Sequence, residues 1–383
     1  MFHESINIPI LIQIFFNSTP CLWKTQPTCA YKMISPVQTV NSILSKILET
    51  LFTILGTITI SLYLIFILPV VLLLFYPYRC FIRLLSKFFK PTFQSMLPCT
   101  SGVLMLDHLH THPTCTIVSV AIMEGSITTE TVVDSFKNVS YQEISQRIVP
   151  WAGYHFWETD PKFNFFNHIV YHHEPKNEKY YVVDDAEICR IQENLMMKPF
   201  RMDRSPWEMV IVRNYISETI CPGVEKSAVM LRIHHSMADG FSISKWFKSL
   251  MSGVVHEPKM VETDRSFSAV GRLGFVCRLL FYGPVEFSMG LVKIWKNGNA
   301  WDKGNKKFTK RYHLSEPRSV PIATIQRAKK AIQVSFTSII FGALAGSVRR
   351  MMLQIGDKLP NKLPMFTPMP LPNHPDHKLT NHA

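Results

Sequence analysis

The sequence lacks the signatures of several common classes of enzyme and binding protein. It contains no GxGxxG segment, no P-loop and no paired-carboxylate signature, so a Rossmann enzyme, a nucleotide hydrolase or a glycosidase is not supported. Eight cysteines occur in 383 residues without a CxxC pair, which argues against a zinc ribbon or a redox motif. Reduced thiols in a protein that faces the cytosol are the simplest interpretation.

Charged residues are also scarce, and their signs are unbalanced. Only 18% of the residues are charged, yet the formal net charge is +13 and the isoelectric point is about 9.3. This charge favours acidic partners such as nucleic acid, anionic lipid or the phosphates of coenzyme A. No nucleic-acid-binding module is recognisable and the basic residues adjoin apolar segments, so we expect a membrane and no nucleic acid as partner.

One long segment has no charge at all. Leu51 to Tyr78 is a run of 28 uncharged residues, whereas roughly 20 apolar residues suffice to cross a bilayer core. We predict a transmembrane helix at 51–78, because a buried helix of a soluble protein would keep a polar face. The residues that flank this run differ in charge: Arg79, Arg83, Lys87 and Lys90 follow it, and Lys32, Lys46 and Glu49 precede it. The larger C-terminal part should therefore face the cytosol, in a single-pass protein of the endoplasmic reticulum or plasma membrane.

The two segments that flank the predicted span have different characters. Residues 1–50 form a leader, whose apolar stretch from Ile8 to Phe16 has neither an n-region charge nor a small-residue cleavage site. A cleaved signal peptide is therefore not indicated. Residues 79–95 are predicted to form a basic juxtamembrane helix.

From about Leu104 onward the pattern becomes that of an α/β domain. Short β-branched runs at 116–120, 179–183 and 209–213 alternate with helical segments. Ser268 to Lys296 is typical of two helices joined at Gly283-Pro284, either interfacial or packed into a core. The basic stretch from Lys303 to Arg311 reads as a solvated linker or as a phosphate-binding segment.

The window from Ala228 to Leu250 carries the clearest chemistry. Apolar residues alternate up to Ile233 and then recur with helical period after Gly240, which predicts a strand, a tight turn and a helix. His234 and His235 therefore fall at the end of the strand. A neutral imidazole there can take the proton of an alcohol that attacks a carbonyl and return it to a leaving thiolate. Asp239 could orient the ring.

The same residues also admit simpler roles. A histidine pair beside a strand can be structural, and Asp239 can act only as a helix N-cap. A His-His-Asp metal site is a further alternative, although it lacks helical i, i+4 spacing. A second histidine cluster, from Asp107 to His112, would put three imidazoles on one face of a strand and could bind zinc, or it could be a polar loop. His172-His173 is expected to lie in a loop.

Three segments resemble the wax ester synthase/diacylglycerol acyltransferase family. His234 to Gly240 matches the HHxxxDG signature of CoA-dependent acyltransferases, and Pro199 to Val212 is similar to the Asp-Arg-Ser and Trp-Glu stretch upstream of it. Val320 to Met351 resembles the helix, short strand and Ala/Gly-rich helix that follow in the family. Thr337-Ser338 replaces the usual Asn-Asp pair at that strand-helix junction.

The resemblance implies roles for the motif. His235 would be the general base, His234 would support it, Asp239 would hold the loop and Gly240 would begin the next helix. Ser236 and Ser242 are candidate oxyanion donors. No metal and no permanently bound cofactor are expected, since acyl-CoA is a co-substrate in this chemistry.

The resemblance also implies an α/β, CoA-dependent acyltransferase-like fold of two lobes behind an N-terminal transmembrane helix. The first lobe, with its interfacial helices, would span 96–300. Only 143 residues follow Gly240, so a partial second lobe is expected at 301–383, as in a truncated chain.

The predicted function is membrane-bound O-acyl transfer from acyl-CoA to a long-chain alcohol or diacylglycerol, giving a wax ester or a triacylglycerol. Two alternatives remain open at this point. One is a truncated, catalytically inactive, membrane-tethered protein that binds lipid or regulates. The other is a single-pass metal-binding protein.

Overall fold

A computed structural model describes most of the chain from residue 36 onward. The described residues are 36–136, 141–172, 182–217, 220, 222–252, 269–297, 311–315, 320–356, 359 and 378–382. Most of the leader, nearly all of the basic stretch at 303–311, His173 and most of the strand predicted at 179–183 lie outside them.

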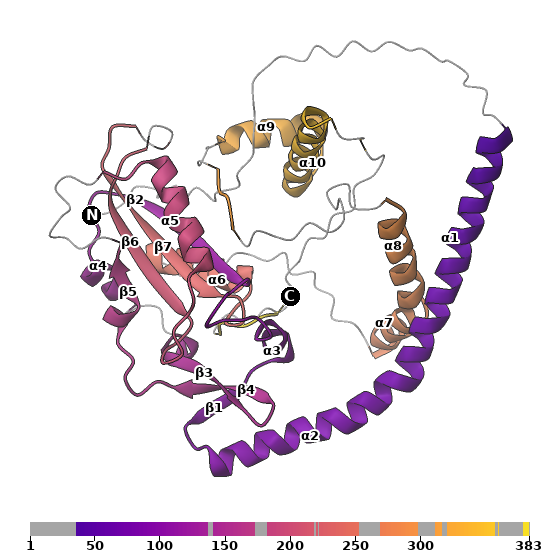
Figure 1. The fold of residues 1–383 in the computed structure, drawn as a ribbon, viewed down its shortest axis with the longest axis horizontal. Helices are drawn as coiled ribbons and strands as arrows, with labels where there is room; N and C mark the ends of the chain where they lie inside the picture. Colours follow the sequence, from indigo (N-terminus) through magenta and orange to yellow (C-terminus); the bar gives the residue numbers. More distant parts are fainter. Residues whose placement is uncertain are drawn as a thin grey trace.

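A four-stranded sheet forms the centre of the α/β part (Figure 1). Its strands follow the order β2 (Thr116–Glu124), β7 (Lys226–His234), β6 (Trp207–Tyr215) and β5 (Ile169–Tyr171). Neighbours are antiparallel except β5 and β6, which run parallel. The strands predicted around 116–120, 209–213 and 229–233 are confirmed. Because Thr116 pairs with His234, the start of β2 lies beside the end of β7.

The two faces of this sheet are buried by different helices. On β7, Val229, Leu231 and Ile233 point to one face and pack with residues of α4 (Thr129–Ser135) and α6 (Gly240–Ser252). The alternate positions, Ala228 and Met230, pack on the other face against α5 (Asp185–Met197). Every residue of β7 is buried, because a central strand covered on both faces leaves no side chain to solvent. The sheet therefore gives the histidines at its end a rigid base.

A second, three-stranded sheet connects the long N-terminal helix to this domain. It has the order β1 (Phe93–Met96), β4 (Tyr154–Thr159) and β3 (Gln146–Trp151), and α3 (Cys99–Leu104) follows β1. Two short 3-10 turns, Gln142–Ser145 and Phe165–Asn167, lie in the same part of the chain. The helix predicted through residue 95 ends at Phe89, because Phe93–Met96 pairs as a strand with β4.

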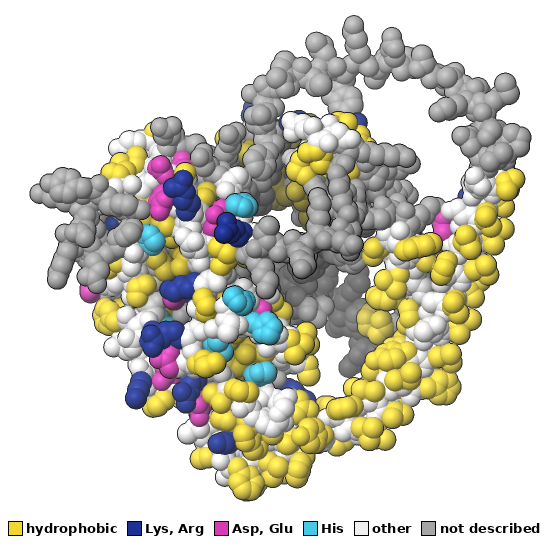
Figure 2. Space-filling view, in the orientation of Figure 1, with side chains coloured by type: hydrophobic (Ala, Val, Ile, Leu, Met, Phe, Trp, Pro, Cys, Tyr) yellow, Lys and Arg dark blue, Asp and Glu magenta, His cyan; other side chains and the backbone are white. Residues whose placement is uncertain are grey.

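The predicted membrane span is part of a longer helix. α1 (Pro36–Leu62), a π-helical turn at Tyr63–Ile67 and α2 (Leu68–Phe89) follow one another without a break, so the helix begins inside the predicted leader. Within the stretch from Val40 to Phe89, an 18-residue window has a mean hydropathy of 2.8, and none of that window is buried inside the protein. Figure 2 shows apolar side chains along its whole visible length. A bilayer is the environment that such a surface fits.

In the described segments after residue 252, four more helices follow the α/β part. α7 (Ala269–Phe281) and α8 (Gly283–Asn297) form the expected helical pair with a bend of 41°, and α8 packs along α1 (Figure 1). α9 (Ile322–Ile332) and α10 (Phe336–Gln354) come next. The short strand expected between α9 and α10 is absent, since Gln333 to Ser335 only turn the chain and the Ser335 hydroxyl caps α10.

α10 also bears on the predicted number of membrane spans. By length and composition it is a second helix that could cross a membrane, and the bent α7–α8 pair would make a third. The prediction of a single span therefore undercounts the described helices that satisfy these criteria.

The last described segment, Lys378–His382, returns to the main sheet. Leu379 is only 3% exposed and belongs to the same core cluster as Trp246 of α6. Residues beyond 300, assigned from sequence to a second lobe, thus supply part of the packing around the end of β7.

Candidate active site

The two histidines lie in a tight turn between β7 and α6. The backbone N–H of His234 donates to the carbonyl of Pro206, and that of His235 donates to the carbonyl of Cys115, at the start of β2. The N–H of Met237 closes the turn on the carbonyl of His234. The strand, turn and helix predicted from the sequence are all present, and three backbone bonds fix the position of both imidazoles.

His234 is fully buried, and both of its ring nitrogens are used. The backbone N–H of Ser236 donates to Nδ1 over 3.2 Å, and Nε2 lies 3.1 Å from Asp107 Oδ2. A carboxylate oxygen can only accept, so Nε2 carries the proton and donates to Asp107. Burial lowers the pKa of His234 further than Asp107 raises it, which favours the neutral ring. No nitrogen of His234 is left to accept a proton from a substrate.

Asp107 holds the turn that precedes β2. Besides the bond from His234, it accepts the backbone N–H groups of Thr114 and Cys115 at 2.7 and 2.8 Å, and the Thr114 hydroxyl at 2.9 Å. Burial raises the pKa of Asp107, but these hydrogen bonds outweigh it and lower the value to about 2. The carboxylate is therefore ionised at neutral pH.

Of the two alternatives for Asp107 to His112, a zinc-binding strand and a polar loop, the structure has the loop. These residues make a turn in which His108 and His112 share an isolated bridge. His110 Nδ1 lies 2.9 Å from the carbonyl of Phe200, so its ring is directed at backbone rather than at the other imidazoles. Within the described residues, no group of three or more His, Cys, Asp or Glu side chains could hold a metal ion.

Replacing Asp107 with Ala is expected to lower the free energy of unfolding by about 3 kcal/mol. The change leaves several donors, among them the buried Nε2–H of His234, without their acceptor, and each such group costs roughly 1–3 kcal/mol. Thermal unfolding of the detergent-solubilised protein measures the effect. Asp203→Ala is the matched control: Asp203 pairs with Arg201 on the surface, so we expect a change within about 0.5 kcal/mol. Equal melting temperatures for the two variants would contradict the assigned role of Asp107.

His235 is only partly buried, and its tautomer is set from outside the motif. Its Nδ1 lies 3.1 Å from Oδ1 of Asn381, while Nδ2 of Asn381 lies 2.8 Å from the carbonyl oxygen of His235 and 3.3 Å from that of Ser236. Carbonyl oxygens only accept, so the end of the amide that faces them is the NH2 group and the other end is an acceptor. His235 Nδ1 therefore carries the proton, and Nε2 keeps its lone pair.

The two adjacent histidines are thus held in opposite tautomers. Nε2 of His234 donates to Asp107, whereas Nε2 of His235 makes no hydrogen bond to any residue that the structure describes. Of the two, only His235 offers a free lone pair on a ring that solvent can reach. This arrangement is what a general base requires before it meets a substrate hydroxyl.

Asn381 is itself held in place by several bonds. Its side chain is 9% exposed, and Nδ2 also donates to the Ser101 hydroxyl over 2.9 Å. Thr100, next to Ser101 in α3, donates its hydroxyl to the Asn381 carbonyl at 3.0 Å. The amide therefore cannot rotate without breaking bonds at both of its ends.

Asp239 and Gly240 lie where the turn passes into α6. Asp239 Oδ1 accepts the backbone N–H of Ser242, as an N-cap of α6, and Oδ2 accepts the N–H of His382. Its own N–H donates to the carbonyl of Thr380. Gly240 begins α6, and a Cβ at this position would meet no atom of the described residues within 4 Å.

The comparisons with known proteins identify the family of the region around this site. The model of the wax ester synthase/diacylglycerol acyltransferase catalytic domain matches residues 109–271. This part of the chain resembles that family. No curated protein matches the sequence.

Solved structures similar to the chain cover only parts of both partners. The wax ester synthase/diacylglycerol acyltransferase from Marinobacter aquaeolei VT8 is 14% identical with a TM-score of 0.30, over 39% of this chain and 35% of that one. A mutant starter condensation domain of rhizomide synthetase in complex with C8-CoA is 11% identical with a TM-score of 0.33, over 43% and 36%. The SgcC5 protein from Streptomyces globisporus is 16% identical with a TM-score of 0.26, over 36% and 29%. The chain thus spans about a third of the length of these proteins.

The Trp-Glu segment, Trp207 and Glu208, supports the site from the neighbouring strand. Trp207 of β6 is 1% exposed and donates Nε1–H to the carbonyl of Ile144. Glu208 pairs with the buried Arg232 of β7 over 3.1 Å, and burial lowers the pKa of Arg232 to about 10. These contacts lock β6 to β7, and neither side chain is bonded to His235.

The two serines that are candidate oxyanion donors, Ser236 and Ser242, bond other groups of the turn. Ser236 Oγ lies 2.8 Å from His234 Nδ1, and Ser242 donates its hydroxyl to the carbonyl of Thr380 over 3.1 Å. Both are buried. Because each hydroxyl already bonds an acceptor inside the turn, neither is presented to a substrate, and their assignment as oxyanion donors is not supported by this geometry.

Sequence reasoning missed two residues of this site, Asp107 and Asn381. The sequence pattern marks Asp107 only as one end of a possible zinc cluster, and Asn381 only as a residue of the partial second lobe expected at 301–383. They lie 127 and 146 positions away from the histidines that they contact. No local pattern in the sequence encodes contacts over such separations.

Proposed function

We propose that this protein transfers a fatty acyl group from acyl-CoA to a lipid alcohol, with His235 as the general base. The observation that carries the proposal is the tautomer of His235, which leaves Nε2 unprotonated on a partly exposed ring. The match of residues 109–271 to the acyltransferase catalytic-domain family supports the type of reaction. The apolar helix from Val40 to Phe89 supports a substrate that resides in a bilayer.

In the proposed reaction, His235 first accepts one proton and later donates it. Nε2 of His235 takes the proton of the acceptor hydroxyl as its oxygen attacks the thioester carbonyl. The imidazolium that forms keeps its Nδ1–H directed at Asn381 Oδ1. When the tetrahedral intermediate collapses, Nε2 returns the proton to the departing thiolate, which leaves coenzyme A and an oxygen ester. Asn381 acts as a positioning residue, and His234 and Asp239 hold the turn.

We further propose that the α/β part lies on the cytosolic side, where acyl-CoA is available. Basic residues follow the apolar run, and the first of them, Arg79, donates to the carbonyl of Leu97 and lies over the ring of Tyr154. These contacts join the end of the long helix to the second sheet. The apolar helix and the candidate active site would then lie at the same surface of the membrane.

Membranes from cells that express this chain are expected to form labelled ester when they receive radiolabelled long-chain acyl-CoA and a lipid alcohol. Parallel reactions contain hexadecanol, diacylglycerol or no acceptor, so that wax ester and triacylglycerol are measured separately by thin-layer chromatography. Membranes with His235→Ala at equal protein level are the control for endogenous enzymes. Product that persists equally in the variant, or no acceptor-dependent product from either, would overturn the proposed activity and favour a binding or regulatory protein.

A further inference from the structure

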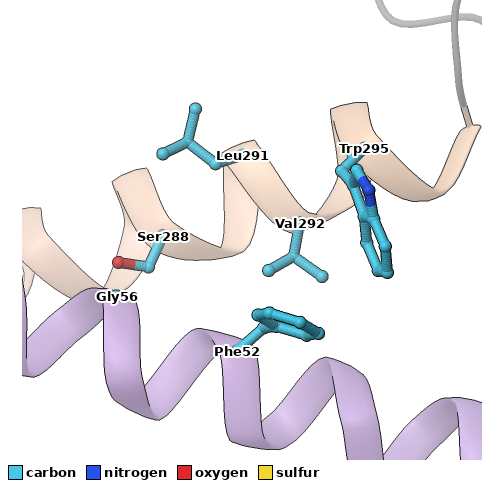
Figure 3. A pocket seen from close by; sticks show the side chains of 6 residues that line it. All are labelled: Phe52, Gly56, Ser288, Leu291, Val292 and Trp295. Atoms are coloured by element: carbon cyan, nitrogen blue, oxygen red, sulfur yellow. The ribbon is translucent and has the colours of Figure 1, made fainter.

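A groove lies between α1 and α8, outside the site described above. α8 contacts α1 through Ser288, which packs directly over Gly56: a Cβ at that glycine would lie 3.0 Å from the Ser288 hydroxyl. Further along, the rings of Phe52 and Trp295 meet with centroids 5.2 Å apart. Figure 3 shows these side chains between the two helices. The groove has a volume of about 340 Å³ and is lined by Phe52, Gly56, Ser288, Leu291, Val292 and Trp295.

The lining is apolar except for two side-chain atoms, the hydroxyl oxygen of Ser288 and the indole nitrogen of Trp295. The four residues from α8 are spaced i, i+3, i+4 and i+7, so they share one face of the helix. None of the six lining residues is charged. An ionised headgroup would find no partner here and would lose its hydration, so the lining fits only an uncharged ligand.

Among the described residues, Ser288 has no hydrogen-bond partner, although it is only 2% exposed. Hydroxyl groups on α1 behave differently: Thr53, Thr57 and Thr59 each donate to the carbonyl four residues earlier, at 2.7–2.9 Å. A buried hydroxyl without a partner is disfavoured, and an incoming polar group would relieve it. In Figure 3 this hydroxyl lies at the Gly56 end of the lining, with the aromatic rings further along.

We propose that this groove binds a single-chain neutral lipid with a hydroxyl headgroup, of the long-chain fatty alcohol class. The hydroxyl of the lipid would bond Ser288, and its hydrocarbon chain would lie along Leu291 and Val292 toward the two rings. The volume is near the lower end of the range for small-molecule sites, roughly 300–1,000 Å³, which favours one chain over two. That the bound alcohol is also the acyl acceptor rests on the proposed function, whereas binding itself does not.

Photolabelling of the full chain in phosphatidylcholine vesicles tests the proposal. The probes are hexadecanol and hexadecane that each carry a diazirine, and mass spectrometry maps the labelled peptides. We expect the alcohol probe to label α1 and α8, and excess hexadecanol to compete. Ser288→Ala should reduce labelling by the alcohol probe about fivefold, the loss expected for one hydrogen bond, and leave labelling by hexadecane unchanged.

Two further variants make the result specific. Ser347→Ala in α10 is the matched control, because Ser347 already donates to the carbonyl of Ala343 and should show no effect. Val292→Phe fills the groove and should reduce labelling by both probes. Equal labelling by the alcohol probe in the wild type and Ser288→Ala, or an equal loss of both probes in Ser288→Ala, would overturn the proposal. If an inactive His235→Ala protein is still labelled by the alcohol probe, binding in the groove does not depend on the proposed reaction.

Discussion

Replacing His235 with Ala is expected to lower kcat for acyl transfer by about 10²–10⁴-fold, the contribution typical of a general base. The hydroxyl of an alcohol is a weak nucleophile until its proton is removed, and Nε2 of His235 is the one ring nitrogen of the motif that is free to take it. The KM for acyl-CoA should change far less than kcat, because the lost interaction belongs to the transition state. Initial rates with labelled acyl-CoA at several concentrations separate the two constants.

The same measurement needs a matched histidine variant. His108→Ala is suitable, because His108 is exposed in the turn beside Asp107 and its ring bonds no group of the motif. We expect this control to keep its rate, and both variants to melt close to the wild type because the His235 ring is only partly buried. A His235→Ala protein that is folded and retains more than about a tenth of the rate would exclude the ring as general base.

The elements that form the site could largely be read from local sequence patterns. The alternation through Val229, Leu231 and Ile233 predicted β7, and the period of Ile243, Trp246 and Leu250 predicted α6, because each pattern reflects which side chains face a core. The position of the histidines at a strand end followed from these two elements. The long apolar helix was equally clear, since composition alone decides whether a segment tolerates lipid.

What the sequence could not supply were the partners that distinguish the two imidazoles. The residues themselves give His234 and His235 the same chemistry, and only Asp107 and Asn381 make one a donor and the other an acceptor at Nε2. For the histidines between Asp107 and His112 the sequence leaves a strand and a loop open, and the bonds that Asp107 accepts from Thr114 and Cys115 close a turn. A side-chain acceptor such as Asp107 competes with a neighbouring strand for the same backbone N–H groups. The strand propensity of the residues alone does not indicate which of the two prevails.

The structure also changes the meaning of the terminal segment. Read from the sequence, residues beyond 300 belong to a partial second lobe. In the structure, Leu379 enters the core of the sheet. The carbonyl of Thr380 accepts the backbone N–H of Asp239, and the backbone N–H of His382 donates to Asp239 Oδ2. The HHxxxDG turn is therefore completed by residues more than 140 positions later in the chain, as the separation of 146 between His235 and Asn381 shows.

Replacing Asn381 with Ala is expected to lower kcat by about 10²-fold, since a small misplacement of a reacting group has an effect of this size. Without Oδ1, His235 Nδ1–H loses its acceptor, and the ring is free to rotate or to change tautomer so that Nε2 no longer faces the substrate as a base. Asn381→Asp should behave differently. A carboxylate opposite Nδ1 keeps the tautomer but stabilises the imidazolium, so the acidic limb of the kcat/KM profile should move to higher pH.

A merely structural role for Asn381 would give another pattern. Both variants lose the donors to the carbonyls of His235 and Ser236, so a purely structural defect would lower their melting temperatures and leave the pH profile of the residual activity in place. Lys378→Ala, at an exposed position of the same segment, serves as the control and should keep both rate and profile. If Asn381→Asp retains the wild-type profile, the amide does not act through the imidazole. If the acidic limb moves, the proton on Nδ1 links this distant asparagine to the base, and the terminal segment is part of the machinery that sets the tautomer.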